Sequence, residues 1–459
     1  METGILEIGG LRHTVCDLSS GGMVLALNKG EQIGAEAEAM LQAFYSRDPG
    51  VIVTKLEELD EKDERKFMDT YYVGYAHKSI GDCGSVTIFI EGVSMLVAKA
   101  VQDFALYNGQ ECSTRYIDFA HQPFVDPIGS LESKGILDEW RTFYLTSQEE
   151  VVAHLMELYP RGTDEKKGVY EKAIKARAFD ILRGFLPAGA ETNLAWHGEL
   201  RQVADHLMRL RNHPLAEVRE VADAAHSVLL KTHPDSFGHK RYEAMEGYLE
   251  WWMKELYYFR HAPYNGVEVL RDGVDPILLS EYQDAMKRRP AKTELPKIVA
   301  ECGTMQFGFM LDFGSFRDVQ RHRAVIQRMP LVTDIHDFEP WYLNALPTGV
   351  AKGATRLLAG QRSQTNNLDE SPLLKQYYIP MGYQLPNRLS GDLPALVYLV
   401  ELRATRFVHP TLVSKASAMA EHLTSRFGNA GLVLHLDDEP GRFDVKRGEQ
   451  DITRRSASS

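Results

Sequence analysis

An internal repeat constrains this sequence most, because a chain that contains the same pattern twice is expected to fold the same unit twice. Residues 82–85 (DCGS) precede an alternating segment, VTIFIEG, and a helical stretch that ends in QDFA at 102–105. Residues 301–304 (ECGT) likewise precede MQFGFMLDFG and a helical stretch that ends in QRHR at 320–323. The two halves therefore share the order strand, helix, loop.

A second pair of segments strengthens the repeat. HPLAEVREVADAAH at 213–226 matches HPTLVSKASAMAEH at 409–422 without a gap, and the two segments follow Arg211 and Arg403. Proline is favoured at the first position of a helix, so each His-Pro pair is expected to begin one. An arginine just before a helix N-terminus suits an anion site, and a solvated side chain is the alternative.

Alternation within both halves predicts strands with one buried face. In the first half Val86, Ile88 and Ile90 alternate with a second set of side chains, Thr87, Phe89 and Glu91. In the second half Met305, Phe307, Phe309 and Leu311 do likewise. Asn108-Gly109 is expected to end the first helical stretch. The predicted fold class is α/β in the α+β sense, with antiparallel sheets and long helices.

The repeat sets the predicted domain boundaries. We expect a first repeat at 1–232, a helical linker at 233–275, a second repeat at 276–440 and a disordered tail at 441–459. The linker contains RYEAMEGYLEWWMKELYYFR, whose aromatic side chains are expected to be packed. The tail is charged and lacks periodicity.

Composition narrows the functional classes. Of the 459 residues 44% are hydrophobic and 25% charged, and no apolar run approaches the roughly 18 residues that span a bilayer. The first residues, METGILEIGG, do not resemble a secretory signal, so we expect a cytoplasmic protein without a membrane partner. A net charge of −12 disfavours nucleic acid as a partner. Four widely spaced cysteines without a CxxC pair predict no metal site.

One polar cluster, QECSTRY at 110–116, follows the first helical stretch. Glu111, Ser113 and Arg115 are two residues apart, so in an extended loop an acceptor, a hydroxyl and a guanidinium project to one side. Such a set suits a pyrimidine nucleotide, with the arginine on phosphate. An ordinary polar loop is the alternative.

A second cluster, Arg321-His322-Arg323, ends the matching helical stretch of the second half. Two guanidinium groups around an imidazole concentrate positive charge and suit a diphosphate or an anionic reduced flavin. A basic helix end that complements the helix dipole is the alternative.

At these residues the sequence resembles the flavin-dependent thymidylate synthase (ThyX) family, whose signature has the form RHR, seven residues, S, x, R, Y, with NE before the serine. Here the signature is divided. The first half keeps QECSTRY but has Asp103-Phe104-Ala105 in place of RHR. The second half keeps RHR, while the places of the glutamate, serine and arginine are taken by other residues, namely Met329, Leu331 and Thr333.

Further motifs resemble those of the family. His77-Lys-Ser79 is similar to its flavin-side motif, and Arg183 in LRGFLP is similar to its phosphate-binding arginine, whose place in the second half falls on Gln376. Arg211 and Arg403 both match the arginine of the family's LR segment.

The resemblance implies an enzyme that methylates dUMP to dTMP reductively, with FAD as cofactor and with NADPH and methylenetetrahydrofolate as co-substrates. It assigns base positioning in catalysis to Glu111 and Ser113. Phosphate binding falls to four arginines, and flavin binding to a second set: Arg115, Arg183, Arg211 and Arg403 for phosphate; Arg321, His322, Arg323, His77 and Ser79 for flavin.

The family assembles as a tetramer whose sites draw on several subunits, so a tandem chain with a divided signature could still complete a site. The expected assembly is a homodimer that forms a pseudo-tetramer. Two alternatives stay open: another flavin-dependent modification of a uracil nucleotide, and a non-catalytic nucleotide-binding relative. A nucleophilic role for Cys112 is not required by this mechanism.

Overall fold

The computed structural model describes residues 2–8, 11–26, 34–36, 38–39, 42, 78–114, 117–163, 165–238, 240–259 and 261–437. The chain forms two compact units, and each combines two separate stretches of sequence. Unit 1 consists of Met1–Val125 and Gly189–Tyr258, and unit 2 of Asp126–Ala188 and Phe259–Ser459. Residues 126–188, which the repeat assigns to the first half, thus belong to unit 2. The repeat-based boundaries remain a prediction, and the tail at 441–459 lies outside the described residues.

Unit 1 contains a six-stranded antiparallel sheet in the order β1-β2-β3-β4-β6-β5. The alternation predicted for the first half is confirmed, since Val86, Ile88 and Ile90 of β4 are all buried. The strands are β1 (Gly4–Ile8), β2 (Leu11–Asp17), β3 (Met23–Ala26), β4 (Ser85–Ser94), β5 (Asn108–Glu111) and β6 (Glu191–Glu199).

The helices of unit 1 follow its central strands. Ser94 ends β4 and begins α4, because its hydroxyl accepts a hydrogen bond from the backbone N–H of Val97. Helix α8 packs on β2 and β3. The helical elements are η2 (Lys78–Asp82), α4 (Met95–Gln102), α7 (Leu200–Leu210), α8 (Ala216–Thr232), α9 (Pro234–Phe237) and α10 (Glu243–Leu256).

Two local expectations for unit 1 are wrong. Helix α4 ends at Gln102, and Asn108-Gly109 begins strand β5 instead of ending the helix. Helix α8 begins at Ala216, two residues after Pro214, because the Arg219 guanidinium binds the carbonyls of His213 and Pro214.

The aromatic linker does form a helix, α10, but its packing differs from expectation. Tyr248 and Trp251 are exposed by 61% and 52%, and Met253 is the buried side chain of this helix. The prediction that the aromatic side chains are packed is therefore wrong for Tyr248 and Trp251 within the single chain.

Unit 2 contains a four-stranded antiparallel sheet in the order β7-β8-β10-β9. Strands β8 and β10 pair along their whole length, and α17 and α18 pack against this sheet. The alternating residues predicted from Met305 to Leu311 lie in β8 and are buried. The strands are β7 (Val267–Asp272), β8 (Thr304–Asp312), β9 (Ile326–Arg328) and β10 (Gln384–Asp392).

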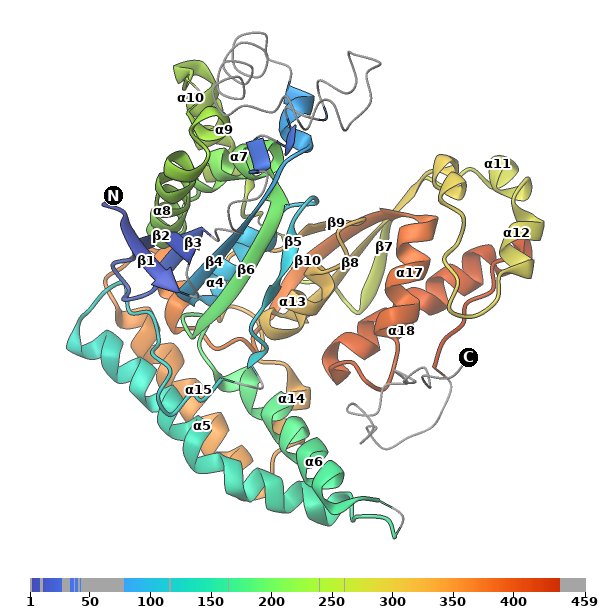
Figure 1. The fold of residues 1–459 in the computed structure, drawn as a ribbon. Helices are drawn as coiled ribbons and strands as arrows, with labels where there is room; N and C mark the ends of the chain where they lie inside the picture. The colour runs from blue at the N-terminus through green and yellow to red at the C-terminus, as the bar shows by residue number, and fades with distance from the viewer. Residues whose placement is uncertain are drawn as a thin grey trace, which may run out of the picture. The chain divides into compact units, whose positions relative to one another are not determined.

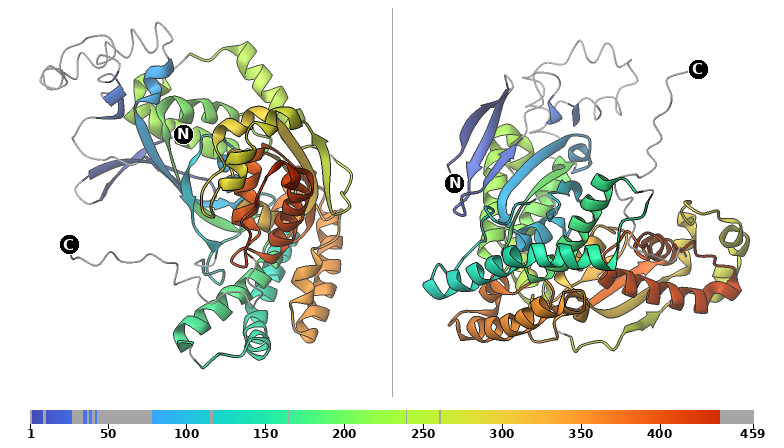
Figure 2. Two further views of the ribbon diagram at one scale, coloured as in Figure 1. Left: turned by 90° about the vertical axis from the view of Figure 1, so that its right-hand side faces the viewer. Right: turned by 90° about the horizontal axis from the view of Figure 1, so that it is seen from below.

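Two long helices of unit 2, α5 and α15, lie side by side (Figures 1 and 2). The α-helices of this unit are α5 (Leu131–Leu158), α6 (Lys167–Leu182), α11 (Pro276–Ser280), α12 (Gln283–Arg288), α13 (Phe313–Gln320), α14 (Pro340–Asn344), α15 (Thr348–Asn367), α16 (Pro372–Lys375), α17 (Leu393–Arg403) and α18 (Pro410–Phe427). Its 3-10 helices are η4 (Arg183–Phe185), η5 (Lys297–Cys302), η6 (Gln376–Tyr378) and η7 (Gly428–Ala430). Helix α18 begins at Pro410, as its His-Pro pair predicts.

A short antiparallel pairing within unit 2 joins segments far apart in the sequence. The N–H of Ala188 donates to the carbonyl of Ile379 (2.9 Å), and the N–H of Met381 donates to Leu186 (2.9 Å). The ring of Phe185 packs beside these segments, 4.9 Å from the ring of Phe338. The two segments follow η4 and η6, which hold Arg183 and its sequence counterpart Gln376.

The two sheets share one order of elements. In each, a strand leads into a helix and a short strand, helices follow, and a last strand leads into two further helices. The strand order β3-β4-β6-β5 corresponds to β7-β8-β10-β9. The predicted class, mixed helices with antiparallel sheet, is confirmed. No helix in the described part of the chain has the length and apolarity to cross a membrane.

Candidate functional site

The Arg-His-Arg segment stands at the C-terminal end of α13 in unit 2. Helix α13 begins where the Asp312 carboxylate accepts a hydrogen bond from the N–H of Ser315 (2.9 Å). At its other end Arg321 and Arg323 are exposed, whereas His322 is buried. The three residues therefore face different surroundings.

The His322 imidazole is held by an arginine from another helix. Nε of Arg403, the last residue of α17, donates a hydrogen bond to Nε2 of His322 (2.7 Å). Burial, together with the charge of Arg403, lowers the pKa of His322 to about 3, so the imidazole is neutral at neutral pH. Its Nδ1 atom has no hydrogen-bond partner within the described structure.

The Asp318 carboxylate lies among these cations. Burial raises the pKa of Asp318, but attraction to Arg183, Arg321 and other guanidinium groups outweighs burial and lowers it. Four guanidinium groups act on this carboxylate, those of Arg183, Arg317, Arg321 and Arg403. Asp180 and Asp312 also act on Arg183, so further carboxylates offset part of this charge. The exposed Arg321 at the edge of this group, named here the α13 cluster, is open to an anion.

Arg183 reaches the α13 cluster from a different part of the sequence. It begins η4 and is buried, and its Nη2 lies 3.4 Å from the Ser315 hydroxyl. Burial alone would lower the pKa of Arg183, but Tyr342 and nearby carboxylates outweigh it and raise the pKa. Its Nε atom is buried without a hydrogen-bond partner among the described residues.

A buried hydrogen-bond network supports Ser315 beneath the cluster. Thr411 donates to Asp312 Oδ2 (2.7 Å), and Tyr342 donates to Asp312 Oδ1 (2.8 Å). Ser315 Oγ lies 2.7 Å from the Thr411 hydroxyl and 3.2 Å from Nδ1 of His409. Because the partners are buried and paired, Ser315 offers Arg183 a fixed position.

The matching helix end in unit 1 has a different arrangement. The Asp103 carboxylate binds the ammonium group of Lys99 and accepts a hydrogen bond from the Tyr257 hydroxyl (2.7 Å). Phe104, in the place of His322, stacks on His206 with ring centroids 4.5 Å apart. The guanidinium of Arg209 lies 5.2 Å from the Phe104 ring. Acidic and aromatic side chains thus replace the cations.

The polar cluster of the first half lies in unit 1. Glu111 is the last residue of β5 and accepts a hydrogen bond from Gln102 (2.9 Å), so the expectation that it lies in a loop is wrong. Ser113 follows the strand and is half-buried. Arg115 and His77 lie outside the described residues. Ser79 lies in η2, and nothing is described of its side chain.

Arg211 and Arg403, which the LR match pairs, differ in their surroundings. Arg211 lines a pocket, with its Nε 3.3 Å from Asp223. Arg209 is the residue that contacts Phe104, as Arg403 contacts His322. Gln376 is buried and accepts a hydrogen bond from the N–H of Val332.

The structure thus brings four of the expected site residues together in unit 2, namely Arg183, Arg321, His322 and Arg403. Asp318 and Arg317 were missed by the sequence analysis. Their signal was available, since they stand one turn before the Arg-His-Arg segment on the same helix. No group of side chains suited to a metal ion occurs among the described residues.

Fold and cluster define an α+β protein with an arginine-rich helix end. Residues 29–235 match the model of a family described as thymidylate synthase complementing protein. The predicted resemblance to the ThyX family is thereby confirmed for this segment, which is less than half of the chain.

Similar proteins extend the comparison beyond that segment. A UPF0159 protein of Chlamydia muridarum is 26% identical over 413 residues, covering 76% of each chain. A UPF0159 protein of Chlamydia pneumoniae is 25% identical and covers 75% of this chain and 76% of its own. A UPF0159 protein of Thermoplasma acidophilum is 20% identical and covers 86% and 94%.

Proposed function

We propose that the protein is a flavin-dependent thymidylate synthase-like enzyme that methylates dUMP to dTMP reductively, with FAD, NADPH and methylenetetrahydrofolate. The observation that carries the proposal is the α13 cluster. It joins Arg183 of the first half of the sequence to Arg321, His322 and Arg403 of the second half. Residues that match the family in different halves of the sequence would meet in this way if the division preserved a site.

The chemistry of the cluster fits the phosphate groups of a flavin dinucleotide or a nucleotide. Arg183 Nε and His322 Nδ1 are buried atoms without hydrogen-bond partners in the described structure. Guanidinium groups bind phosphate oxygens through charged hydrogen bonds. Arg321 is exposed and within electrostatic reach of Asp318, so it is accessible to an anion.

Each residue has a proposed role. Arg321, His322 and Arg323 hold the flavin, with His77 and Ser79 added by the family resemblance. Arg183, Arg403 and Arg115 bind the dUMP phosphate, and the resemblance adds Arg211. Glu111 and Ser113 position the uracil ring. Bound FAD would supply the redox chemistry, while the protein orients the substrate and excludes water.

Two tandem ThyX-like copies provide the proposed architecture. The shared order of elements in the two sheets and the repeated segments support it. Two chains would then form a homodimer that resembles the family's tetramer. Light scattering should give a dimer at micromolar concentrations, and a stable monomer near 51.8 kDa with flavin present would contradict this part.

Visible absorbance of the purified protein tests the proposal. Bound oxidised flavin should give its characteristic bands, and turnover assays with dUMP, NADPH and methylenetetrahydrofolate should yield dTMP. Flavin without dTMP would favour a different flavin-dependent modification of a uracil nucleotide. Absence of flavin after reconstitution would favour the non-catalytic relative.

A mixing experiment asks how sites are completed. Arg321→Ala and Arg115→Ala chains are each expected to be inactive. If a site needs residues of two chains, mixing them should restore about a quarter to a half of activity, because some mixed dimers hold one intact set. If each chain completes its own site, mixing restores nothing.

A further inference from the structure

Helix α10 of unit 1 has an exposed side that carries two large aromatic groups. Tyr248 and Trp251 are exposed by 61% and 52%, and their ring centroids lie 6.0 Å apart. The segment that matches the family model ends at residue 235, so α10 lies beyond it. Adjacent exposed aromatic groups commonly mark an interaction surface.

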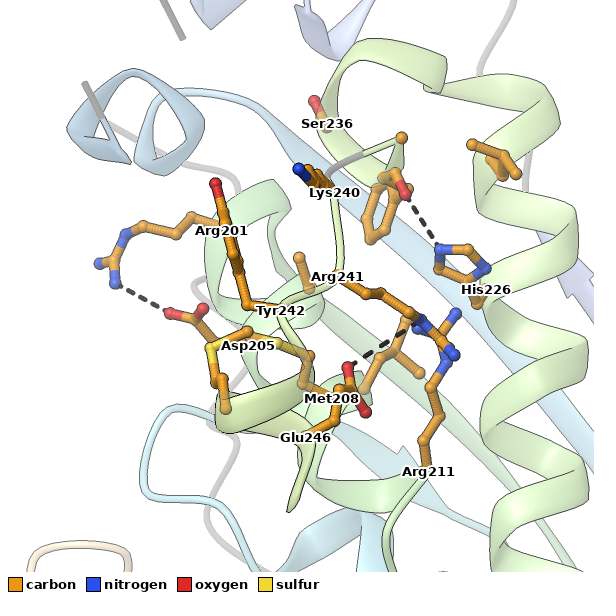
Figure 3. A pocket seen from close by; sticks show the side chains of 16 residues that line it. Arg201, Asp205, Met208, Arg211, His226, Ser236, Lys240, Arg241, Tyr242 and Glu246 are labelled. Atoms are coloured by element: carbon orange, nitrogen blue, oxygen red, sulfur yellow. Dashed lines mark hydrogen bonds and ion pairs between the residues drawn. The ribbon is translucent and has the colours of Figure 1, made fainter. Parts of the chain in front are cut away.

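The other side of α10 is anchored to unit 1. The Glu246 carboxylate lies 3.9 Å from Nε of Arg241 (Figure 3), and it accepts a hydrogen bond from the side chain of Asn212 (3.3 Å). At the end of the helix the Tyr257 hydroxyl binds the C-cap carboxylate of α4. Because Glu246, Tyr257 and the buried Met253 recur at helical spacing, they share this side. The opposite, aromatic side is therefore held in a fixed position.

The centre of the exposed side is apolar and includes a glycine. Ala244, Gly247, Tyr248 and Trp251 recur at intervals of three and four residues, which places them on one side of the helix. Glycine inside a helix is unfavourable relative to alanine. A Cβ atom at Gly247 would meet nothing within 4 Å in the described chain, so its own packing does not require glycine there. Close approach of a second helix would require it.

The charges beside this side favour a second copy of the same helix as its partner. Glu243 stands in the first turn of α10 and Lys254 in the last, at equal distances from the point between Tyr248 and Leu249. When two copies of α10 pack antiparallel about a two-fold axis at that point, Glu243 of each copy lies opposite Lys254 of the other. Two pairs of opposite charges then flank the aromatic centre.

The other carboxylates of α10 avoid one another in this antiparallel register. Glu250 lies opposite Gly247, and Glu255 lies opposite Tyr242. Glu246 is turned toward Arg241. A parallel pair would instead bring each carboxylate beside its own copy, where like charges repel. The charge pattern therefore selects the antiparallel pair.

The size of the aromatic surface fits a central contact within a larger interface. An aromatic side chain buries about 150–250 Å², so the exposed parts of Tyr248 and Trp251 amount to roughly 250 Å² per copy. A standard interface buries about 800 Å² per partner. The two rings would supply roughly a third of this area, and tryptophan and tyrosine are the residues that most often dominate binding energy.

We propose that α10 packs antiparallel against α10 of a second copy of this chain, as a contact of the homodimer proposed above. Trp251 and Tyr248 form the apolar centre, Gly247 allows the helices to approach closely, and Glu243 pairs with Lys254 at each end. The proposal rests on the proposed homodimer, but it requires neither flavin binding nor catalysis.

Sedimentation velocity of the full chain over micromolar concentrations, without added flavin, tests the contact. The wild-type chain should dimerise, and Trp251→Ala should weaken dimerisation by roughly tenfold or more. Ile277→Ala is the matched control, because it removes a large apolar side chain that is 80% exposed outside α10, and it should have no effect. Equal dimerisation of wild type and Trp251→Ala would overturn the proposal.

A charge exchange tests the antiparallel register. Glu243→Lys and Lys254→Glu should each weaken dimerisation by roughly 2- to 30-fold, because each dimer contains two such pairs. The double variant restores opposite charges across the pair, so it should dimerise like the wild type. A merely structural role of either residue would give additive losses, and a double variant weaker than both single variants would overturn the proposed register.

Crosslinking separates failure of this contact from failure of the proposed function. Gly247→Cys, close to the two-fold axis, should be crosslinked into dimers by a short bismaleimide, above the level of the wild-type chain with its four cysteines. Gly360→Cys on α15, where a Cβ atom also meets nothing within 4 Å, should not. A dimer without the Gly247→Cys crosslink would overturn the α10 contact alone, and a monomeric wild type would overturn both the contact and the homodimer. A crosslinked dimer that binds no flavin would support the contact and contradict only the proposed enzyme.

Discussion

The ends of α13 and α4 occupy the same position in their sheets but carry opposite chemistry. At the end of α13, cations surround Asp318, and His322 is bound by Arg403. At the end of α4, Asp103 is bound by Lys99 and Tyr257. Phe104 is covered by His206 and Arg209. One end is arranged to attract an anion, whereas the other has satisfied its charge internally.

This difference shows how two helices in matching positions can share a fold and differ in charge. Both helices begin at a capping residue that ends a strand, Ser94 in one case and Asp312 in the other. The positions that set the fold are therefore equivalent, while the three residues after each helix are not. Variants at these two helix ends test the comparison.

The largest effect is expected on flavin content. Arg321→Ala removes an exposed guanidinium from the α13 cluster, so bound flavin should fall by roughly tenfold or more. Asp103→Ala is the matched control and should leave flavin content unchanged, because Asp103 is engaged by Lys99 and Tyr257. Visible absorbance per mole of protein measures both. Full flavin occupancy in Arg321→Ala would contradict the proposal that the end of α13 binds flavin and the end of α4 does not.

The second largest effect is expected on the affinity for dUMP. Arg183→Gln gives the first half the residue that the second half has at Gln376, and Arg115→Ala removes the other predicted phosphate ligand. Each should weaken dUMP binding by roughly 10- to 150-fold, corresponding to about 1.5–3 kcal/mol, with little change in flavin content. Calorimetry measures the affinity, and Arg356→Ala, exposed on α15, is the control. Unchanged affinity in both variants would refute the phosphate role.

The buried imidazole should make stability depend on pH. The pKa of His322 lies near 3 in the folded chain against an ordinary value of 6.5, so the unfolded chain binds the proton first. The contribution of His322 to the free energy of unfolding is therefore complete above pH 6.5. It declines as pH falls toward 3, at roughly 1.4 kcal/mol per pH unit.

His322→Phe, which copies Phe104, should reduce that decline without abolishing it, because the pKa of His206 is also lowered, to about 4. Burial is the main cause of that shift as well. Urea unfolding at pH 7 and pH 4 measures the change. Arg356→Ala, an exposed change on α15, should keep the wild-type pH dependence. An identical loss in His322→Phe and wild type would show that His322 is protonated in the folded state.

The smallest effect is expected at Arg209 and Arg403, which contact Phe104 and His322. Arg209→Ala should lower the free energy of unfolding by about 0.5–1 kcal/mol through loss of its contact with the Phe104 ring, and should leave flavin content alone. Arg403→Ala should reduce flavin content, because His322 loses its hydrogen bond. Denaturant unfolding and absorbance measure the pair, and equal flavin loss in both would show that the two ends are not distinct.

Sequence patterns predicted the parts of the fold that depend on local chemistry. Alternation located β4 and β8, and the His409-Pro410 pair located the start of α18. The same signal failed at Pro214, since the Arg219 side chain binds the carbonyls on which a helix would depend. Such a contact is made by a side chain and leaves no periodic trace in the sequence.

The sequence predicted several residues of the candidate site but not which of them lie close together. Arg183 was assigned to phosphate from its motif, yet its place beside Ser315 depends on residues 126–188 joining unit 2. The order of the motifs along the chain predicted instead that the two repeats are separated at the linker. Asp318 was missed because an acidic residue within a helix is usually solvated, and its role appears only once the surrounding guanidinium groups are placed.

The pairing of residues 186–188 with 379–381 also has a consequence for synthesis on the ribosome. Helices α5 and α6 and residues 186–188 leave the ribosome early. The residues of unit 2 that pair with this segment and cover it are synthesised much later. At roughly 5–20 residues per second, the interval is on the order of ten seconds or more. During it, residues such as Trp140 and Phe185, which are fully buried in the finished chain, remain uncovered. Binding by chaperones at this stage, and aggregation when they are scarce, are the expected results for a chain whose units are interleaved in sequence.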